Sequence, residues 1–229
     1  RGRGGRPLKR DEIHRWLQGR GTMPLSQIRD QFPQAASHLR ILLKEGGVVA
    51  EQVEQLRDPF FGQDVERDQP FTLTNAQANA VQEVVQCSEY TGYLLHGITG
   101  SGKTEVYLQM IDQRRTKDEC ALVLVPEIAL TPQLVQRFRA RFGDEIAVLH
   151  SGLSDGQRYD QWRRIHRKEV QIIIGARSAL FAPIRQPLSI IVVDEEHDAS
   201  YKQGDGIRYH ARDMALMLGY LRKVPVVLG

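Results

Sequence analysis

The sequence predicts an α/β fold with a parallel sheet covered on both faces, preceded by a small helical domain. Short, continuous apolar stretches alternate with helical stretches from about residue 71 onward, a pattern typical of strands buried on both faces. Residues 97–104 read Gly-Ile-Thr-Gly-Ser-Gly-Lys-Thr, the pattern of a phosphate-binding loop between a strand and a helix. The 229 residues, 41% of them hydrophobic, can form one medium domain and one small domain.

The small domain is expected over residues 1–52 and has the pattern of a winged helix. Three helices followed by a β-wing is the order of such a module, whose third helix can enter a DNA groove. On that helix, His38, Arg40 and Lys44 would form the polar side. Many modules of this shape bind protein instead, so contact with DNA is left open. The apolar spacing and the glycine and proline stops place helices over 11–17, 26–32 and 35–45, and a strand over 48–50.

Residues 53–70 are expected to be a linker with an aromatic anchor at Phe60 and Phe61, because proline, glycine and charged residues interrupt any periodicity there. The large domain then covers residues 71–229. Ligands of such parallel sheets bind beyond the carboxyl ends of the strands, where the 97–104 loop would lie. Strands are predicted over 93–96, 120–125, 146–149, 170–174, 189–193 and 224–228, and helices over 75–87, 104–115, 131–142, 155–168 and 210–221.

The residue types of the 97–104 loop suit a nucleoside triphosphate. Gly100 and Gly102 let the main chain approach phosphate without a Cβ in the way. The backbone N–H groups and the positive end of the following helix favour an anion. The Lys103 ammonium would reach the β- and γ-phosphates, and the Thr104 hydroxyl would hold Mg²⁺. The alternative is a glycine-rich turn that contains Lys-Thr by chance.

An acidic box follows the predicted strand over 189–193. It reads Asp194-Glu195-Glu196-His197. Asp194, fixed by the packing of the strand, is expected to hold Mg²⁺, and Glu195 to orient and deprotonate an attacking water. Taken alone, the box could be an acidic turn at a strand end. Paired with the phosphate-binding loop on one sheet, it predicts an ATP hydrolase whose catalytic residues are Lys103, Asp194 and Glu195.

Gln77, near the start of the first helix of the large domain, is the candidate reader of the adenine base. Its amide offers both a donor and an acceptor to the adenine edge. The alternative is a glutamine that faces solvent. The residues expected to bind the nucleotide are therefore Gln77, Gly97, Thr99, Gly100, Ser101, Gly102, Lys103, Thr104 and Glu105.

Composition excludes some classes of protein and favours others. No apolar stretch approaches the length of about 20 residues that a membrane span needs, and no secretory segment opens the chain. The two cysteines, Cys87 and Cys120, have no paired spacing, so a reducing cytosol fits best. The net charge is only +3, but basic residues gather in three clusters, which suggests an anionic partner such as nucleic acid. The alternative is ordinary solvated helix faces. The clusters are Arg1 to Arg10, Arg137 to Arg141, and Arg158 to Lys168.

The motifs together resemble the primosomal replication-restart DNA helicases of bacteria, the PriA family within superfamily 2. The matching segments follow the family's order and cover most of residues 71–229. The tail Thr-Glu-Val-Tyr-Leu after the loop, and Ser-Tyr-Lys-Gln after the acidic box, separate the chain from other superfamily 2 helicases such as RecG. The resemblance is carried by residues 96–108, 124–133, 149–154, 174–183 and 194–203.

The resemblance implies that residues 71–229 form the first RecA-like lobe of an ATP-dependent 3′-to-5′ DNA helicase. Such a helicase acts in replication restart at stalled or abandoned forks and in primosome assembly. The implied partners are forked and single-stranded DNA, primosome proteins and the single-strand-binding protein, with no membrane partner. The implied location is the bacterial cytoplasm, in association with the nucleoid.

The resemblance also implies DNA contacts by the motifs between the two ATP boxes. Hydroxyl, main-chain and guanidinium donors to phosphate suit a protein that tracks a DNA backbone. Residues 201–210 resemble the family's aromatic-rich loop, which could stack on unpaired bases and link DNA occupancy to hydrolysis. The alternative is a mobile surface turn whose tyrosines pack inward. The residues expected to contact DNA are Thr131, Pro132, Ser151, Gly152, Arg177, Ser178, Tyr201, Lys202, Arg208 and Tyr209.

Compared with the family, the chain stops before the next helicase motif. The second lobe, with its arginine finger and cysteine-rich zinc module, is not in the sequence, so zinc is not expected. Because an arginine finger contributes about 10³- to 10⁵-fold in rate, the chain is expected to bind ADP or ATP weakly and to hydrolyse it negligibly. A competing hypothesis is a regulatory DNA-binding module in which the loop-bearing lobe only senses nucleotide. A small-molecule kinase is disfavoured because it leaves the segments 124–133 and 174–183 unexplained.

Overall fold

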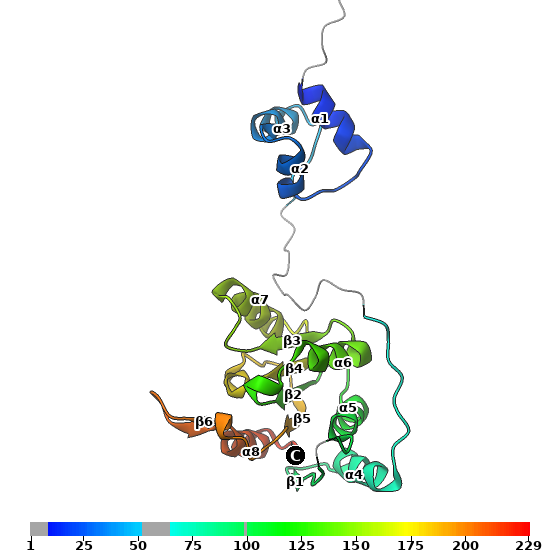
Figure 1. Ribbon diagram of the computed structural model, residues 1–229, viewed down its shortest axis with the longest axis vertical. Coiled ribbons are helices and arrows are strands. Elements are labelled where there is room, and N and C mark those ends of the chain that lie inside the picture. The colour runs from blue at the N-terminus through cyan, green and yellow to red at the C-terminus, as the bar shows by residue number, and fades with distance from the viewer. Residues whose placement is uncertain (1–8, 52–64, 99) are drawn as a thin grey trace, which may run out of the picture. The chain divides into compact units, whose positions relative to one another are not determined.

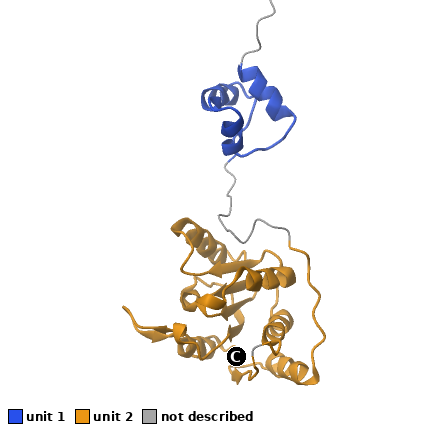
Figure 2. Ribbon diagram, in the orientation of Figure 1, with its two compact units in different colours: residues 1–55 blue, residues 56–229 orange. Residues whose placement is uncertain are grey.

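The computed structural model describes residues 9–51, 65–98 and 100–229 (Figure 1). The chain divides into two compact units, residues 1–55 and 56–229 (Figure 2). Thr99 of the phosphate-binding loop and the Phe60-Phe61 anchor of the linker lie outside the described residues. Among the described residues, no helix has both the length and the apolar character needed to cross a membrane.

The small unit is built from the three predicted helices. Its core brings together Ile13, Ile28 and Leu39, one from each helix. Trp16 and Phe32 add an edge-to-face contact, with ring centroids 5.5 Å apart. The helices are α1 (Lys9–Gln18), α2 (Leu25–Gln31) and α3 (Ala35–Lys44).

The predicted strand over residues 48–50 is wrong. The described residues after α3, up to Glu51, contain no strand. A strand needs a neighbour that pairs with its N–H and C=O groups, and the described part of this unit offers none. The feature that distinguishes a winged helix from a plain three-helix bundle is therefore not seen, and the winged helix stays a prediction.

The large unit is an α/β domain with a six-stranded, entirely parallel sheet. The strand order is β1-β8-β5-β2-β4-β3, so β5 and β2 lie at the centre. The strands are β1 (Gly92–Leu94), β2 (Cys120–Leu124), β3 (Ile146–Leu149), β4 (Ile172–Gly175), β5 (Leu188–Val193) and β8 (Val226–Leu228). The helices are α4 (Asn75–Gln86), α5 (Lys103–Arg114), α6 (Pro132–Phe142), α7 (Asp155–His166) and α8 (Ala211–Arg222).

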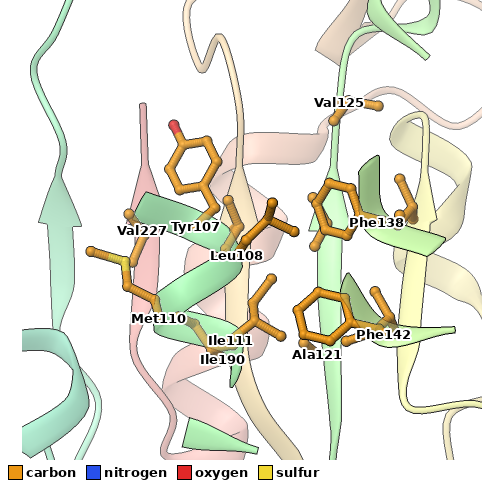
Figure 3. Packing of buried hydrophobic residues seen from close by; sticks show 14 of the residues in the cluster. Tyr107, Leu108, Met110, Ile111, Ala121, Val125, Phe138, Phe142, Ile190 and Val227 are labelled. Atoms are coloured by element: carbon orange, nitrogen blue, oxygen red, sulfur yellow. The ribbon is translucent and has the colours of Figure 1, made fainter. Parts of the chain in front are cut away.

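Alternating residues of each strand divide the core into two layers. Along β5, Ile190 and Val192 join the cluster under α4, α5 and α6, whereas Ile191 and Val193 join the cluster under α7 and α8. Figure 3 shows the first layer, with α5 and α6 packed over the sheet. Burial on both faces explains why strands β2 to β5 and β8 are apolar at almost every position, whereas β1, at one edge of the sheet, has exposed residues.

The six strands and five helices of the large unit are confirmed, with bounds that differ from the predictions by at most two residues. The structure adds three short 3₁₀ turns and a small antiparallel hairpin that were not predicted. Their backbone pattern depends on tertiary contacts and leaves no periodic signal in the sequence. They are η1 (Glu127–Ala129), η2 (Arg177–Phe181), η3 (Ala199–Tyr201), β6 (Lys202–Gln203) and β7 (Tyr209–His210).

The described end of the predicted linker is part of the large unit. The Asp68 N–H donates to the Ala140 carbonyl at 3.0 Å, and the Arg67 guanidinium donates to the Arg141 carbonyl at 3.3 Å. Residues 67–68, which were predicted to belong to the linker, are thus hydrogen-bonded to α6.

Candidate functional site

The phosphate-binding loop runs from β1 to the first turn of α5. Gly100 and Gly102 have φ angles of +82° and +84°, in the left-handed region where a Cβ is strained. Gly102 is the residue that caps the amino end of α5. The loop therefore presents backbone N–H groups and the positive end of α5 to the same space, which suits a phosphate.

Lys103 connects the two sequence motifs. Its ammonium donates to the Gly97 carbonyl at 2.9 Å, and lies 3.6 Å from a carboxylate oxygen of Glu195. Its side chain is 14% exposed, so this charge is largely buried at the edge of the sheet. The loop after β1 and the acidic box after β5 thus meet at one edge of the sheet, as the sequence predicts for an ATP site.

Asp194 begins the acidic box at the carboxyl end of β5. Its N–H donates to the Leu124 carbonyl at 2.9 Å, which fixes it to the neighbouring strand β2. Glu195 follows with a φ angle of +48°, a strained value for a non-glycine residue. Strain of this kind at a strand end is common where a side chain is held for function.

Two buried tyrosines bind Asp194 at different atoms. The Tyr107 hydroxyl of α5 donates to the Asp194 carboxylate at 3.1 Å. The Tyr201 hydroxyl of η3 donates to the Asp194 main-chain oxygen at 2.7 Å. Burial raises the pKa of Asp194, and the Tyr107 hydrogen bond and Lys103 act in the opposite direction. Burial next to Asp194 also raises the pKa of both tyrosines, so their hydroxyls stay protonated donors.

The residues at this edge fit a magnesium ion held together with a nucleotide. Thr104 lies in the first turn of α5, and the contacts of Lys103 and Tyr107 bring that turn against the acidic box. A hydroxyl and a carboxylate are hard oxygen ligands, and Mg²⁺ commonly takes one or two of these plus phosphates and water. The described residues contain no group of three or more His, Cys, Asp or Glu that could hold a metal by itself.

Gln77 lies against the loop but its amide already has partners. The amide nitrogen donates to the Ser101 carbonyl at 2.9 Å. The amide oxygen accepts from the Thr74 N–H at 2.8 Å, which forms a capping box at the start of α4. The role of Gln77 as a reader of adenine stays a prediction, and such a contact would use its second N–H group.

Glu105, a predicted nucleotide-binding residue, points elsewhere. Its carboxylate accepts hydrogen bonds from Arg141 of α6 at 3.0 and 3.1 Å. It also accepts from the Phe71 N–H at 3.2 Å, and its residue is 5% exposed. These side-chain contacts lie outside the phosphate loop, because the residue after Thr104 faces the neighbouring helix. The adjacency of Glu105 to the motif in the sequence was therefore misleading.

The predicted DNA contacts follow the carboxyl ends of β2, β3, β4 and β5, so the parallel sheet brings them to the same edge as the loop. Thr131 caps α6 by accepting from the Leu134 N–H at 3.3 Å, and Pro132 is the first residue of that helix. Ser151 and Gly152 form the turn after β3, and Ser178 is exposed in η2.

Glu127 is a member of this edge that the sequence analysis missed. Its carboxylate accepts hydrogen bonds from both the N–H and the hydroxyl of Ser151. The hydrogen bond from the Ser151 hydroxyl is the largest cause that lowers the pKa of Glu127. Glu127 lies within the segment 124–133 that carries the resemblance. The sequence nevertheless does not indicate that this acid contacts Ser151, because an acid that faces only solvent would read the same.

The structure corrects the prediction for Tyr201, which lies in η3 directly before the hairpin β6–β7. Tyr201 is fully buried, so it cannot stack on a base in this conformation, and the inward-packing alternative holds for it. Tyr209 is partly buried and meets Phe181 edge-on, with ring centroids 5.2 Å apart. Lys202 and Arg208 are exposed, as phosphate contacts require.

Arg177 ties the hairpin to the motif after β4. Its guanidinium donates to the Ser200 carbonyl at 2.9 Å and to the Lys202 carbonyl at 3.3 Å. Arg177 is therefore a bridge between two predicted DNA-contact segments, in addition to any contact with phosphate.

Several arginines of the predicted basic clusters are buried. Arg139 contacts Asp144 at 2.7 Å, and Arg141 contacts Glu105. Arg164 donates to the main-chain oxygens of Ile146 and Asp144. These three hold α6 and α7 in place and offer no exposed charge to DNA. Counting basic residues along the sequence overestimates the basic surface, because the count includes arginines on the buried face of a helix as well as those on its exposed face.

Comparisons with known proteins agree with this geometry. The family model described as DEAD/DEAH box helicase matches residues 74–227. The replication restart protein PriA of Bacillus subtilis (strain 168) is 44% identical over 210 residues, which cover 90% of this chain and 26% of that protein. The PriA protein of Synechocystis sp. (strain ATCC 27184) is 47% identical over 210 residues, covering 91% of this chain and 25% of that protein.

The chain spans about a quarter of the length of these relatives. Among solved structures, RecG bound to a three-way DNA junction matches with a TM-score of 0.52 and 17% identity. That match covers 96% of this chain and 26% of the RecG chain, and at this identity it shows the fold alone. It agrees with the parallel α/β architecture of the large unit.

Proposed function

The chain belongs to the DEAD/DEAH box helicase family, and we propose on that premise that it forms the nucleotide-binding motor lobe of an ATP-dependent 3′-to-5′ DNA helicase. The observation that carries this proposal is the approach of Lys103 to Glu195 at 3.6 Å. The two residues come from motifs more than ninety positions apart, and a nucleotide motor needs both at one site.

Each residue has a separate task in this proposal. The loop amides and Lys103 hold the β- and γ-phosphates of ATP, and Thr104 and Asp194 would hold Mg²⁺. When bound, Mg²⁺ supplies positive charge that neutralises the phosphate oxygens. Glu195 orients the attacking water and accepts its proton.

The DNA track is proposed to lie along the same edge of the sheet. Exposed Lys202 and Arg208 are suited to phosphate contacts, as is the Thr131-Pro132 start of α6. The hydrogen bond from Tyr201 to the Asp194 main-chain oxygen connects the base of the hairpin to the ATP site. A movement of the hairpin on DNA would therefore reach Asp194 directly, which supports a link between strand occupancy and hydrolysis.

The biological setting is proposed from the relatives. Both PriA proteins compared above are named replication restart proteins. We infer that the complete protein acts at stalled or abandoned forks, binds forked and single-stranded DNA, and assembles with primosome proteins and the single-strand-binding protein. The proposed location is the bacterial cytoplasm, associated with the nucleoid.

A Lys103→Ala variant tests the motor. In the complete protein, unwinding is expected to be lost while fork binding is largely kept, because the change removes a phosphate ligand and leaves the DNA track intact. Unwinding that survives would favour the alternative, a DNA-binding module in which this lobe only senses nucleotide. In the chain itself, the variant should weaken ADP binding by roughly 10- to 100-fold, the range for a lost hydrogen bond to a charged group. Lys117→Ala is the matched control, because Lys117 is exposed in the turn before β2, at the opposite edge of the sheet.

A further inference from the structure

We propose that Tyr107 is a positioning residue for magnesium: its hydroxyl holds one carboxylate oxygen of Asp194 so that the other faces the metal of the bound nucleotide. This inference rests on the proposed function, because it requires that Asp194 serve a nucleotide-bound Mg²⁺. It assigns a task to a side chain that touches neither the phosphates nor the metal.

The helix periodicity places Tyr107 correctly for this task. Tyr107 lies four residues after Lys103 and three after Thr104, so all three share one face of α5. The ring is 2% exposed and packs in the apolar layer over the sheet. Figure 3 shows the ring beside Val227, with the hydroxyl pointing out of the apolar cluster. A buried tyrosine hydroxyl needs a partner, and here it is the Asp194 oxygen Oδ1 at 3.1 Å.

The hydroxyl fits a notch that the main chain leaves open. A Cβ added at Gly229 would stand 1.8 Å from the Tyr107 hydroxyl oxygen, so the absence of a side chain there makes room for it. Gly229 is itself held, since its N–H donates to the Val193 carbonyl and its carbonyl accepts from the Glu196 N–H, both at 2.9 Å. The wall of the notch is thus fixed to the strand that carries Asp194.

The second tyrosine at Asp194 cannot do the same work. The Tyr201 hydroxyl binds the main-chain oxygen, which does not turn with the side chain. Of the two tyrosine hydrogen bonds, only the one from Tyr107 reaches the carboxylate, which also accepts a main-chain hydrogen bond from Glu195. Both tyrosines are buried and both bind Asp194, one at the carboxylate and the other at the main-chain oxygen, so variants of the two can be compared.

A carboxylate that rotates freely presents its oxygens to a metal in many orientations. Residues that orient metal ligands typically contribute 10- to 100-fold to metal affinity. The Tyr107→Phe variant keeps the ring and its packing and removes only the hydroxyl. We expect it to raise the Mg²⁺ concentration for half-maximal enhancement of ADP binding by about 10-fold or more. ADP binding measured in EDTA should stay at the wild-type value, because the phosphate loop is untouched.

The experiment titrates a fluorescent ADP analogue with the chain, first in EDTA and then over a Mg²⁺ series. Tyr201→Phe should shift the Mg²⁺ midpoint less than Tyr107→Phe does. Tyr93→Phe should not shift it, since the Tyr93 hydroxyl lies 3.4 Å from the Glu83 carbonyl on α4, away from Asp194. Gly229→Ala, which keeps Tyr107 but occupies its notch, should shift the midpoint in the same direction as Tyr107→Phe.

The outcomes separate the inference from the proposed function. A wild-type chain that binds no ADP at millimolar concentration overturns both. A wild-type chain with Mg²⁺-enhanced binding and a Tyr107→Phe variant with an unchanged midpoint overturns only the inference. Equal shifts for Tyr107→Phe and Tyr201→Phe also overturn it, because they would reflect a general loosening of the strand end.

Discussion

Arg141 of α6 binds the carboxylate of Glu105 on α5, at 3.0 and 3.1 Å from its two oxygens. Both side chains are almost fully buried, with 4% and 7% of their surfaces exposed. Because Glu105 directly follows Thr104, the pair fixes the first turn of α5 to α6. A residue next to the phosphate loop thus contributes through the packing of the helices.

Breaking this pair is expected to destabilise the large unit strongly. Arg141→Met should lower the free energy of unfolding by about 3–5 kcal/mol, because it leaves the Glu105 charge buried without its partner. Adding Glu105→Leu should recover part of the loss, since apolar residues can replace a buried ion pair at little net cost. Urea unfolding of the single and double variants measures both effects.

An exposed ion pair provides the control for this prediction. Arg167 and Glu169 lie 3.8 Å apart, and about half of each side chain is exposed. Arg167→Ala should therefore change stability by about 1 kcal/mol or less. Equal effects of Arg141→Met and Arg167→Ala would contradict the structural role of the buried pair.

Glycine substitutions in the loop separate backbone strain from a side-chain clash. Gly100→Ala and Gly102→Ala both place a Cβ at a left-handed φ, which costs roughly 1–2 kcal/mol each. A Cβ at Gly100 meets nothing within 4 Å, whereas one at Gly102 stands 2.9 Å from the Gln77 amide nitrogen. Gly102→Ala should therefore also break the bond from Gln77 to Ser101 and weaken ADP binding further. Unfolding curves and ADP titrations of the two variants test this, and a larger effect of Gly100→Ala would count against it.

The sequence predicts the elements of the large unit well because most of its strands are buried on both faces. Runs such as Ile190 to Val193 read as strands at every position, and the loop and acidic box each follow such a run. Because these strands are all similarly apolar, the sequence does not reveal the strand order. Nothing in an apolar stretch indicates which neighbouring strand it pairs with. The carboxyl ends of parallel strands nevertheless lie at the same edge of a sheet. The loop and the acidic box are therefore expected to share that edge, even when the strand order is unknown.

The failures concern side-chain direction. Glu105 directly follows Thr104 in the sequence, but its carboxylate binds Arg141 of α6 and the Phe71 N–H, contacts that the sequence pattern does not reveal. Tyr201 reads as an exposed aromatic in a glycine-rich stretch, and only the tertiary fold places it under Asp194. Tyr107 left a usable signal that was missed: it lies one helical turn after Lys103 and therefore on the same face.

Glu127 and Ser151 give a pH-dependent signature at the candidate DNA edge. The Ser151 hydrogen bonds hold the pKa of Glu127 below its ordinary value of 4.5. Because the folded pKa is lowered, the associated stability is present above the unfolded pKa and is lost as the pH falls through the folded pKa. Ser151→Ala should raise the pKa of Glu127 toward the ordinary value, as an NMR titration of its carboxyl carbon would record.

A second serine provides the control for that titration. Ser200 is the largest cause of the lowered pKa of Asp198, and a Ser200→Ala variant should raise the pKa of Asp198. The same variant should leave Glu127 at its wild-type value. A Glu127 titration that is insensitive to Ser151→Ala would mean that the hydrogen bond does not persist in solution.

The salt dependence of DNA binding tests which cations face DNA. Since Arg139, Arg141 and Arg164 are engaged inside the fold, we expect the exposed hairpin cations Lys202 and Arg208 to carry phosphate contacts. Each phosphate contact to a single strand contributes about 0.7 to the slope of log affinity against log salt. Lys202→Ala and Arg208→Ala should each reduce the slope by about that amount. Arg167→Ala is the control and should leave the slope unchanged, because Arg167 lies at the end of α7 that is far from the candidate DNA edge. A wild-type slope near zero would show that Lys202 and Arg208 only face solvent.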